Sequence, residues 1–371
     1  MRQWFTPRTA ALTLAMMAGF SPTEAAATPI SQSLQSQSVN VRDAQAEDPD
    51  ELYNKAAMEG ELSLYAQGPP QVYADLVRQF EARYPKVKVR VTPGRYDVIA
   101  KVDDQLKAGR VDADIVTAQT VQHLVRWKRN GRLMTYAPAE ASGISAKFKD
   151  ASGTSFFPLS LYVIGSAYNA EKVADAEAPK TVQDFLQPRF KGKIVSTYPH
   201  DDDVTLYLYT TIVEKYGWSF VEQLVAQEPK YVRSHVLVGD LTSSGERPVT
   251  FDQISTFNKV QFFAPGDVPM VVFPYAMGSF ANSPHPNAAK LFLNFSLSKE
   301  QQDRFAKRNI WSARGDVEPP AGFKPLSSYN VAADFIEFIS DEKRVNDLRG
   351  RFEKIIGPVA GEYISTSPGA R

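Results

Sequence analysis

The stretch ELSLYAQGPPQVYADLVRQFEARYPKVKVRVT, residues 61–92, predicts the fold class because its hydrophobic period changes twice. Residues 62–66 form a short apolar strand, and residues 73–84 carry apolar side chains at helical spacing until Pro85 ends the helix. KVKVRVT then alternates strictly between polar and apolar residues, as a half-buried strand does. The stretch therefore predicts a strand, a helix and a second strand in succession.

The same alternation continues on both sides of this stretch. A helix is expected over residues 50–59 before Gly60, and RYDVIAKVDDQLKAGR, ADIVTA and TVQHLVRWKRNG predict a helix, a strand and a helix. Alternating strands and helices are typical of an α/β fold with a parallel sheet that helices cover on both faces. Ligands of such sheets bind at the carboxyl ends of the strands, in the loops that lead to the helices.

The second half of the chain predicts a second α/β unit. The apolar run 157–167 is expected to cross from a first lobe to a second, and the strand 269–280 to cross back. The elements expected between and after them are helix 181–190, strand 192–198, helices 205–216 and 220–226, strands 231–237 and 248–252, helix 287–297, and charged helices from 331 onward.

The amino terminus has the pattern of a secretory signal peptide. Arg2 and Arg8 precede the apolar run TAALTLAMMAGF, and small residues end the segment. We predict a signal peptide over residues 1–27, with cleavage after Ala27, and a flexible polar leader over residues 28–49. The apolar run is too short for a membrane anchor, so no membrane insertion is expected after cleavage.

Composition and missing motifs exclude several classes of function. Lys plus Arg and Asp plus Glu both count 42, which argues against a nucleic-acid partner, and the absence of cysteine excludes thiol nucleophiles and cysteine metal sites. The chain has no G-x-S-x-G elbow and no glycine-rich phosphate loop. A D-x-D pattern at residues 201–203 is a weak sign of a metal-dependent transferase. We therefore expect no enzyme and no cofactor.

Four stretches resemble extracellular solute-binding proteins, family 1, of bacterial ABC transporters, a group with receptors for ferric iron, thiamine, polyamines and sugar phosphates. They are LYNKAAMEGELSLYAQGPP, FEARYPKVKVRV with LKAGRVDADIV, YVIGSAYNAEKV with APKTVQDFLQPRFKGKIV, and SPHPNAAKLFLNFSLSKEQQDRFA. The resemblance implies a type II periplasmic binding protein, with two α/β lobes, a hinge and a ligand cleft between the lobes. Lobe I would comprise residues 50–158 and 276–330, lobe II residues 159–275, and carboxy-terminal helices residues 331–371.

The resemblance implies a monomeric periplasmic receptor that delivers a small polar solute to the permease of an ABC importer. Three alternatives stay open, namely a receptor for Fe(III) or another metal ion, a ligand sensor for a signalling partner, and a secreted enzyme. Iron receptors of the group commonly use two adjacent tyrosines, where this chain has Phe251 and Asp252. The sequence leaves the identity of the ligand open.

Candidate ligand-binding residues follow the expected strands. In lobe I these are Gln67, Gly68, Arg95, Gln119 and Thr120. They offer neutral hydrogen-bonding groups, and Arg95 offers a fork of donors that suits a carboxylate.

In lobe II the candidates are Tyr162, the run His200-Asp201-Asp202-Asp203, and Asp252. One aspartate of the run is expected to cap the following helix, and the others are either solvated or in contact with a ligand. A carboxylate cluster would repel a phosphate and suit an amine, a hydroxyl-rich molecule or a cation.

Overall fold

The structure is a computed structural model that describes residues 47–67, 70–94, 96–119, 121–254 and 260–363. The predicted signal peptide and nearly all of the predicted leader lie outside these residues. At the centre of the fold are two long antiparallel strands, β4 (Phe156–Tyr168) and β9 (Met270–Ser279). They correspond to the two strands that the sequence predicts to cross between lobes.

The first part of the sheet is parallel, as the sequence predicts. β1 (Glu61–Gln67) pairs in parallel with β2 (Lys88–Gly94) on one side and with β3 (Ile115–Ala118) on the other. β3 then pairs antiparallel with β9, and β7 (Val249–Ile254) pairs antiparallel with β4. The order β2-β1-β3-β9-β4-β7 is therefore a mixed sheet, because the crossing strand β9 returns against the direction of β3.

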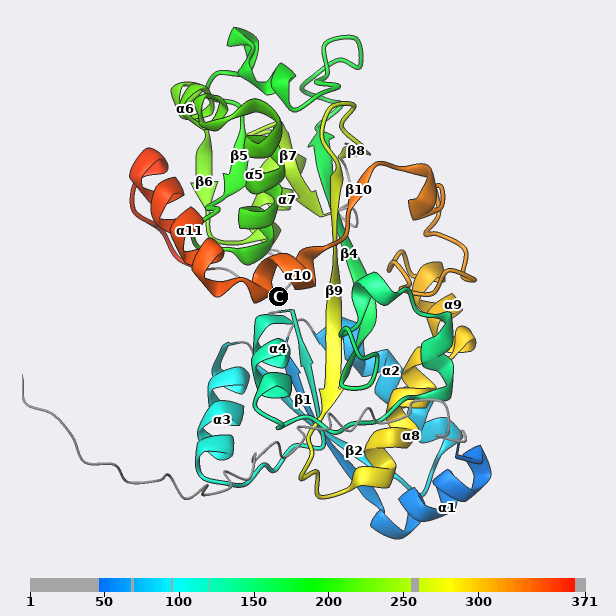
Figure 1. The fold of residues 1–371 in the computed structure, drawn as a ribbon. Helices are drawn as coiled ribbons and strands as arrows, with labels where there is room; N and C mark the ends of the chain where they lie inside the picture. Colours follow the sequence, from blue (N-terminus) through cyan, green and yellow to red (C-terminus); the bar gives the residue numbers. More distant parts are fainter. Residues whose placement is uncertain (1–46, 68–69, 95, 120, 255–259, 364–371) are drawn as a thin grey trace, which may run out of the picture. The chain divides into compact units, whose positions relative to one another are not determined.

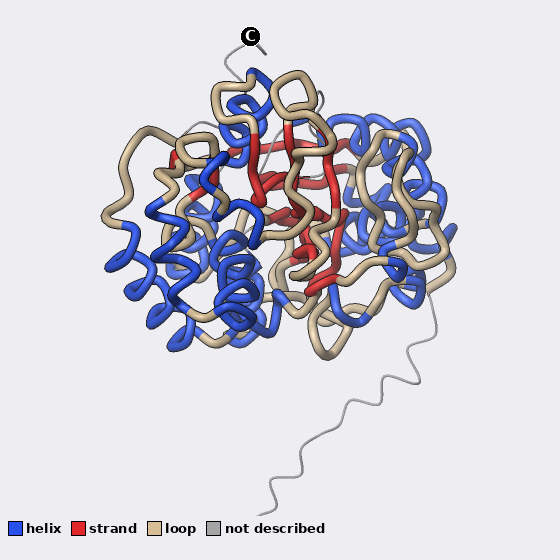
Figure 2. The backbone as a smooth tube through the Cα atoms, turned by 90° about the horizontal axis from the view of Figure 1, so that it is seen from above, coloured by secondary structure: helices blue, strands red, loops and turns tan. Residues whose placement is uncertain are grey.

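Helices cover both faces of the sheet in lobe I. α1 (Pro49–Glu59), α2 (Pro70–Arg83) and α8 (Pro286–Leu297) share one buried apolar cluster, whereas α3 (Tyr96–Lys107) and α4 (Val121–Arg129) belong to another. Figure 1 shows α3 and α4 on one side of β1 and α2 and α8 on the other. Figure 2 shows the strands between these helical layers.

Local signals fix the first helix. The Asp48 side chain caps α1 by accepting hydrogen bonds from the backbone N–H groups of Asp50 and Glu51. Gly60 ends the helix at a φ of 77°, a left-handed conformation that favours glycine. Both boundaries follow from residue type, which explains why this helix was predictable.

Lobe II contains a smaller parallel sheet. β5 (Val195–Thr197) pairs with β6 (Lys230–Val232), and a bridge between Ile194 and Val249 connects β5 to β7. The helices of this lobe are α5 (Asp203–Tyr216), α6 (Trp218–Ala226) and α7 (His235–Ser244). The carboxyl end of β5 therefore leads into α5 through the loop that carries the three aspartates.

The carboxy-terminal segment contacts both lobes. α10 (Phe335–Ser340) packs against α4 and α5, and α11 (Glu342–Ile356) packs against α5 and α6. Phe335 and Phe338 are buried, which contributes about 1.5–3 kcal/mol for each side chain. In Figure 1, α10 lies between α5 and α4. The exact boundaries of the lobes and of the carboxy-terminal helices stay a prediction.

The remaining elements have short spans. They are β8 (Gln261–Phe263), β10 (Val331–Ala332), α9 (Lys299–Lys307), and the 3-10 turns η2 (Ala139–Gly143), η3 (Ala146–Phe148), η4 (Gln183–Leu186), η5 (Pro188–Phe190) and η6 (Leu326–Ser328).

Two predicted elements were wrong in type. The helix expected over residues 181–190 is a pair of 3-10 turns, η4 and η5, because Pro188 has no N–H for a continuous helix and disfavours helical geometry before it. The strand expected over residues 231–237 stops after three residues. Ser234 accepts a hydrogen bond from the N–H of Val236 and starts α7 instead. A capping side chain outweighed the β-branched residues that follow it.

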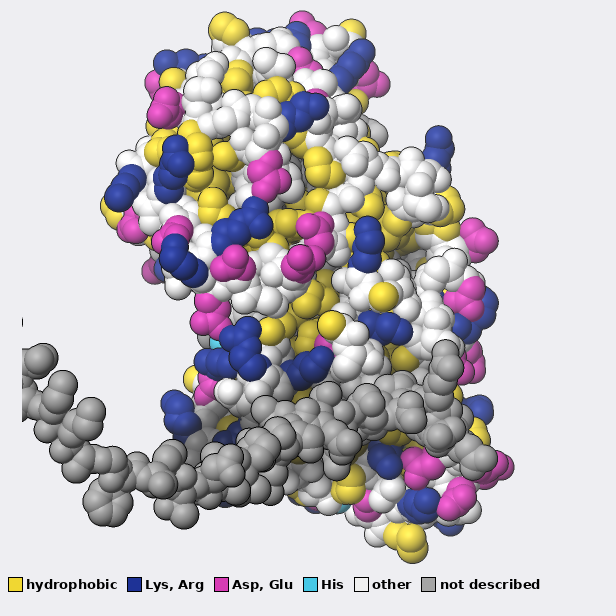
Figure 3. All heavy atoms as spheres, in the orientation of Figure 1, with side chains coloured by type: hydrophobic (Ala, Val, Ile, Leu, Met, Phe, Trp, Pro, Cys, Tyr) yellow, Lys and Arg dark blue, Asp and Glu magenta, His cyan; other side chains and the backbone are white. Residues whose placement is uncertain are grey.

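The visible surface mixes charges. Figure 3 shows basic and acidic side chains interspersed over the described residues of one face, which fits the equal numbers of the two kinds in the sequence. Within the described part of the chain, no helix has the length and apolar character needed to span a membrane.

Candidate functional site

The carboxyl ends of the lobe I strands are joined by neutral hydrogen bonds. The backbone N–H of Gln119 donates to Oε1 of Gln67 at 2.9 Å, which links the ends of β3 and β1. The hydroxyl of Tyr275 donates to the carbonyl of Gln67 and lies 2.8 Å from Oγ1 of Thr117. The structure thus brings Gln67 and Gln119 together, at the sheet edge where the sequence predicts ligand contacts.

Three predicted site residues, Gly68, Arg95 and Thr120, lie outside the described residues. They directly follow the described positions Gln67, Gly94 and Gln119 in the chain. Their role at the site stays a prediction.

The first two aspartates of the lobe II loop have different roles. Asp201 accepts two hydrogen bonds from the guanidinium of Arg233, at 2.7 and 3.1 Å. Asp202 is the N-cap of α5, since its Oδ1 accepts from the N–H groups of Val204 and Thr205 at 3.0 and 2.9 Å. The predicted capping role is confirmed for Asp202.

Asp203, the third aspartate, connects the two lobes. Its Oδ2 accepts a 2.5 Å hydrogen bond from Nε2 of Gln122 on α4, and its Oδ1 pairs with Arg349 on α11. Burial raises the pKa of Asp203, and the positive charge of Arg349 opposes that rise. The residue next to the cap therefore faces lobe I, which capping alone does not require.

His200 packs against an aromatic ring. Its ring lies 5.4 Å from the ring of Tyr198. Burial lowers the pKa of His200, so the imidazole is neutral at pH 7. His200 takes no part in the separate hydrogen bonds of Asp201, Asp202 and Asp203.

Asp252 lies inside lobe II. Its carboxylate is fully buried, and Oδ2 accepts from the N–H and the hydroxyl of Thr197, both at 2.8 Å, and from the hydroxyl of Ser196 at 3.1 Å. Its Oδ1 lies 3.0 Å from Nε2 of His235. Ser196 and Thr197 end β5, so Asp252 holds the residues from which the β5–α5 loop starts.

His235 links Asp252 to the helix cap. Its Nδ1 lies 3.9 Å from Oδ2 of Asp202. Burial lowers the pKa of His235, but the negative charges of Asp252 and Asp202 and the hydrogen bond to Asp252 outweigh burial and raise it to about 9. His235 is therefore protonated at pH 7, and one cation serves two carboxylates.

Tyr162 lies on the crossing strands. It stacks on Phe273 with ring centroids 5.2 Å apart and makes an edge contact with Tyr275 at 6.2 Å. Burial raises the pKa of Tyr162 to about 12, so its hydroxyl stays protonated. Because Tyr275 also binds Gln67, Tyr162 belongs to an aromatic row that leads to the strand ends of lobe I.

Sequence reasoning missed four residues that organise this site, namely Gln122, Arg233, His235 and Arg349. Arg349 is 146 positions from Asp203, and His235 is 17 positions from Asp252. Neither spacing corresponds to a motif, so no signal in the sequence could have paired them.

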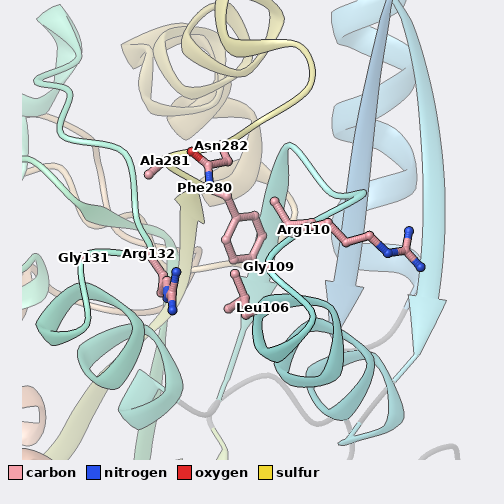
Figure 4. A pocket seen from close by; sticks show the side chains of 9 residues that line it. Leu106, Gly109, Arg110, Gly131, Arg132, Phe280, Ala281 and Asn282 are labelled. Carbon is pink, nitrogen blue, oxygen red and sulfur yellow. The ribbon is translucent and has the colours of Figure 1, made fainter.

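One small cavity lies away from these residues. It measures about 60 Å³, and Val111 and Phe280 among its lining residues flank the start of β3 and the end of β9. Figure 4 shows the Phe280 ring near Gly109 and Leu106, with Arg110 extending away from it. This cavity lies at the amino end of β3, opposite the edge where α/β sheets bind ligands. Among the described residues, no three acidic or histidine side chains gather as potential metal ligands.

Comparison with known proteins supplies the family. The sequence profile of a family described as bacterial extracellular solute-binding proteins matches residues 112–330, more than half of the chain. The probable ABC transporter periplasmic-binding protein y4fP of Sinorhizobium fredii is 25% identical over 126 residues, or 31% of this chain and 34% of the relative. The chain thus spans about a third of the length of this curated relative.

Solved structures agree on the fold. The substrate binding protein of an ABC transporter from Agrobacterium tumefaciens superposes with a TM-score of 0.68 and 16% identity, over 80% of this chain and 94% of that one. Apo ferric ion-binding protein A from Pasteurella haemolytica gives a TM-score of 0.66 and 16% identity, over 80% and 98%. At these identities the likeness shows the two-lobe fold alone. Together with the matching profile, it means that the chain belongs to the bacterial extracellular solute-binding proteins.

Proposed function

We propose that this chain is a periplasmic receptor that captures a small polar solute between its lobes and delivers it to an ABC importer. The observation that carries the proposal is the 2.5 Å hydrogen bond from Gln122 to Asp203. The chain that makes this bond belongs to the extracellular solute-binding proteins. Gln122 follows the β3–α4 loop of lobe I, and Asp203 begins α5 of lobe II. The polar ends of both lobes therefore face each other.

Capture requires no covalent chemistry. A solute that contacts both lobes shifts the equilibrium toward the closed form. The free energy of this shift equals the difference between the solute's binding free energies for the closed and the open form. The permease then recognises the closed form. Family and fold are those of solute-binding proteins. We therefore propose a receptor without catalytic turnover.

The charges around the site favour a neutral or amine-bearing solute. The described strand ends of lobe I carry the neutral side chains of Gln67, Thr117 and Gln119. In lobe II the carboxylate of Asp202 already occupies the amino terminus of α5, which is where a helix usually binds an anion. A phosphate would meet that carboxylate, so a phosphorylated solute is disfavoured.

An iron receptor is the less favoured alternative. Several of the similar solved structures are ferric ion-binding proteins. In this chain Phe251 is 1% exposed, and the adjacent Asp252 is fully buried with both oxygens engaged by lobe II groups. These two positions, where iron receptors of the group commonly place tyrosines, offer no ligand to a metal between the lobes.

The proposed location and organisation follow from the same family. We propose that residues 1–27 direct export to the periplasm and that the mature chain works there as a monomer. The proposed lobe boundaries, at residues 158/159 and 275/276, fall inside β4 and β9. The bending region would then lie within the two crossing strands.

A thermal-melting screen of the mature protein against a library of polar solutes tests the receptor function. A solute at 100 times its Kd stabilises the folded state by about 2.7 kcal/mol, which raises Tm by several degrees. We expect one chemical group of solutes to raise Tm and to be recovered unchanged. Conversion of the solute, or no shift with the library and with the solutes extracted from native periplasm, would contradict the proposal.

The double variant Asp201→Ala/Asp203→Ala links the screen to the site. We expect at least tenfold weaker binding of the identified solute by calorimetry, with the fold unchanged by circular dichroism. Asp347→Ala, which removes an exposed carboxylate of α11, is the matched control and should bind as the wild type does. Equal affinity of the double variant would remove the triplet from the site.

A further inference from the structure

The side chain of Asp203 is shared between an intralobe and an interlobe contact. Arg349 holds Oδ1 from α11, a helix that packs against α5 and α6 of lobe II. Gln122 donates to Oδ2 from α4 of lobe I. Only the second contact has to break when the lobes separate, because Arg349 stays with lobe II.

The two contacts suit a bond that breaks and reforms. Arg349 compensates the charge of Asp203 in either arrangement, so separation leaves no unpaired charge inside lobe II. The Asp203 side chain is 13% exposed, so the hydrogen bond is largely shielded from water. Oε1 of Gln122 has no partner among the described residues, which indicates that this side chain is held by its donor group alone.

Other contacts across the same boundary are weaker or less specific. Arg129 on α4 lies 3.3 Å from Glu342 on α11, but both side chains are more than half exposed, and such pairs contribute little. α10 packs against both α4 and α5 through apolar side chains. Such packing is non-directional, whereas the hydrogen bond to Asp203 fixes one geometry.

We propose that Gln122, Asp203 and Arg349 form a latch that populates the closed form before a solute binds. The inference rests on the proposed receptor function and adds its regulation. A receptor whose binding-competent form is already populated binds with higher apparent affinity. The latch therefore sets how much of the closure the solute itself must drive.

The test measures the distance between lobes without a solute. The chain has no cysteine, so Met58→Cys on α1 and Glu222→Cys on α6 give two unique, exposed labelling positions. Spin labels at both positions report the open and closed populations by pulsed electron resonance. In this background we compare the wild-type latch with Gln122→Ala, and with Gln223→Ala on α6 as the matched control.

We expect Gln122→Ala to raise the ratio of open to closed molecules about tenfold, as the loss of a hydrogen bond to a charged group does. Gln223→Ala should leave the distance distribution unchanged. Identical distributions for wild type and Gln122→Ala overturn the latch, whichever form dominates. Because no solute is present, that result leaves the receptor function to be decided by the solute screen alone.

Discussion

The two lobes stabilise equivalent strand ends by opposite means. In lobe I the end of β1 is held by neutral groups, with Gln67 bonded to Tyr275 and to the backbone of Gln119. In lobe II the end of β5 is held by charges, with Asp252 bonded to Thr197 and to protonated His235. Neutral bonds are insensitive to pH and ion pairs are not, so of these two strand ends only that of lobe II should respond to pH.

Among the variants that test this comparison, removal of the buried carboxylate of Asp252 should lower the unfolding free energy most. Asp252→Ala leaves His235 as a buried cation and removes the acceptor of Thr197, which should cost about 3–5 kcal/mol of unfolding free energy. Urea unfolding followed by circular dichroism measures the change. Asp347→Ala removes an exposed carboxylate and should cost less than about 1 kcal/mol. Equal, small losses in the two variants would show that the pair is not structurally important.

The second-largest effect should be the change of the wild-type unfolding free energy with pH, which His235 causes. The pKa of His235 is about 9 in the folded state against 6.5 ordinarily, so its contribution is complete below pH 6.5 and disappears as the pH rises through 9. The wild type should lose up to roughly 3 kcal/mol between these values. Unfolding curves measured at several pH values report this loss.

The matched variant for the pH experiment is His235→Gln. Glutamine can still donate to Asp252 but does not titrate, so its stability should vary much less over the same range. If the unfolding free energy of the wild type depended on pH as little as that of the variant, the prediction that His235 is charged in the folded state would be wrong.

The smallest effect is expected at the lobe I strand ends, which Tyr275 of the crossing strand β9 contacts. Tyr275→Phe removes one hydroxyl that bonds to Thr117 and to the carbonyl of Gln67, which should cost about 1 kcal/mol. Burial raises the pKa of Tyr275 far above its ordinary value, so the loss should be the same at pH 6 and pH 9. Tyr329→Phe, which removes a hydroxyl that accepts an exposed backbone hydrogen bond, is the control. A pH-dependent loss for Tyr275→Phe would remove the contrast between the lobes.

Much of the fold was predictable because it follows from local residue patterns. The elements of lobe I, from α1 to α4, lie within a few residues of their predicted positions. The errors fall where two local signals compete. Pro188 breaks a pattern that otherwise indicates a helix, and Ser234 starts a helix inside a run typical of a strand.

The candidate site was only partly predictable. A cap by one aspartate of the triplet follows from its place before a helix, and Asp202 provides it. The partners of the other two aspartates do not follow, because Arg233 and Arg349 lie far along the chain and the sequence contains many other arginines. Sequence reasoning gave Asp252 a place among the ligand contacts, whereas the fold buries it inside lobe II.

The sequence by itself determined most of the succession of strands and helices, the cap of α5 and the polarity of the strand-end loops. These properties depend on residues within one or two turns of each other. Only the tertiary structure decided that β9 runs against β3, that His235 lies between Asp202 and Asp252, and that Gln122 reaches Asp203. Such contacts join residues from distant segments, and their geometry exists only after the chain has packed, so no local pattern encodes them.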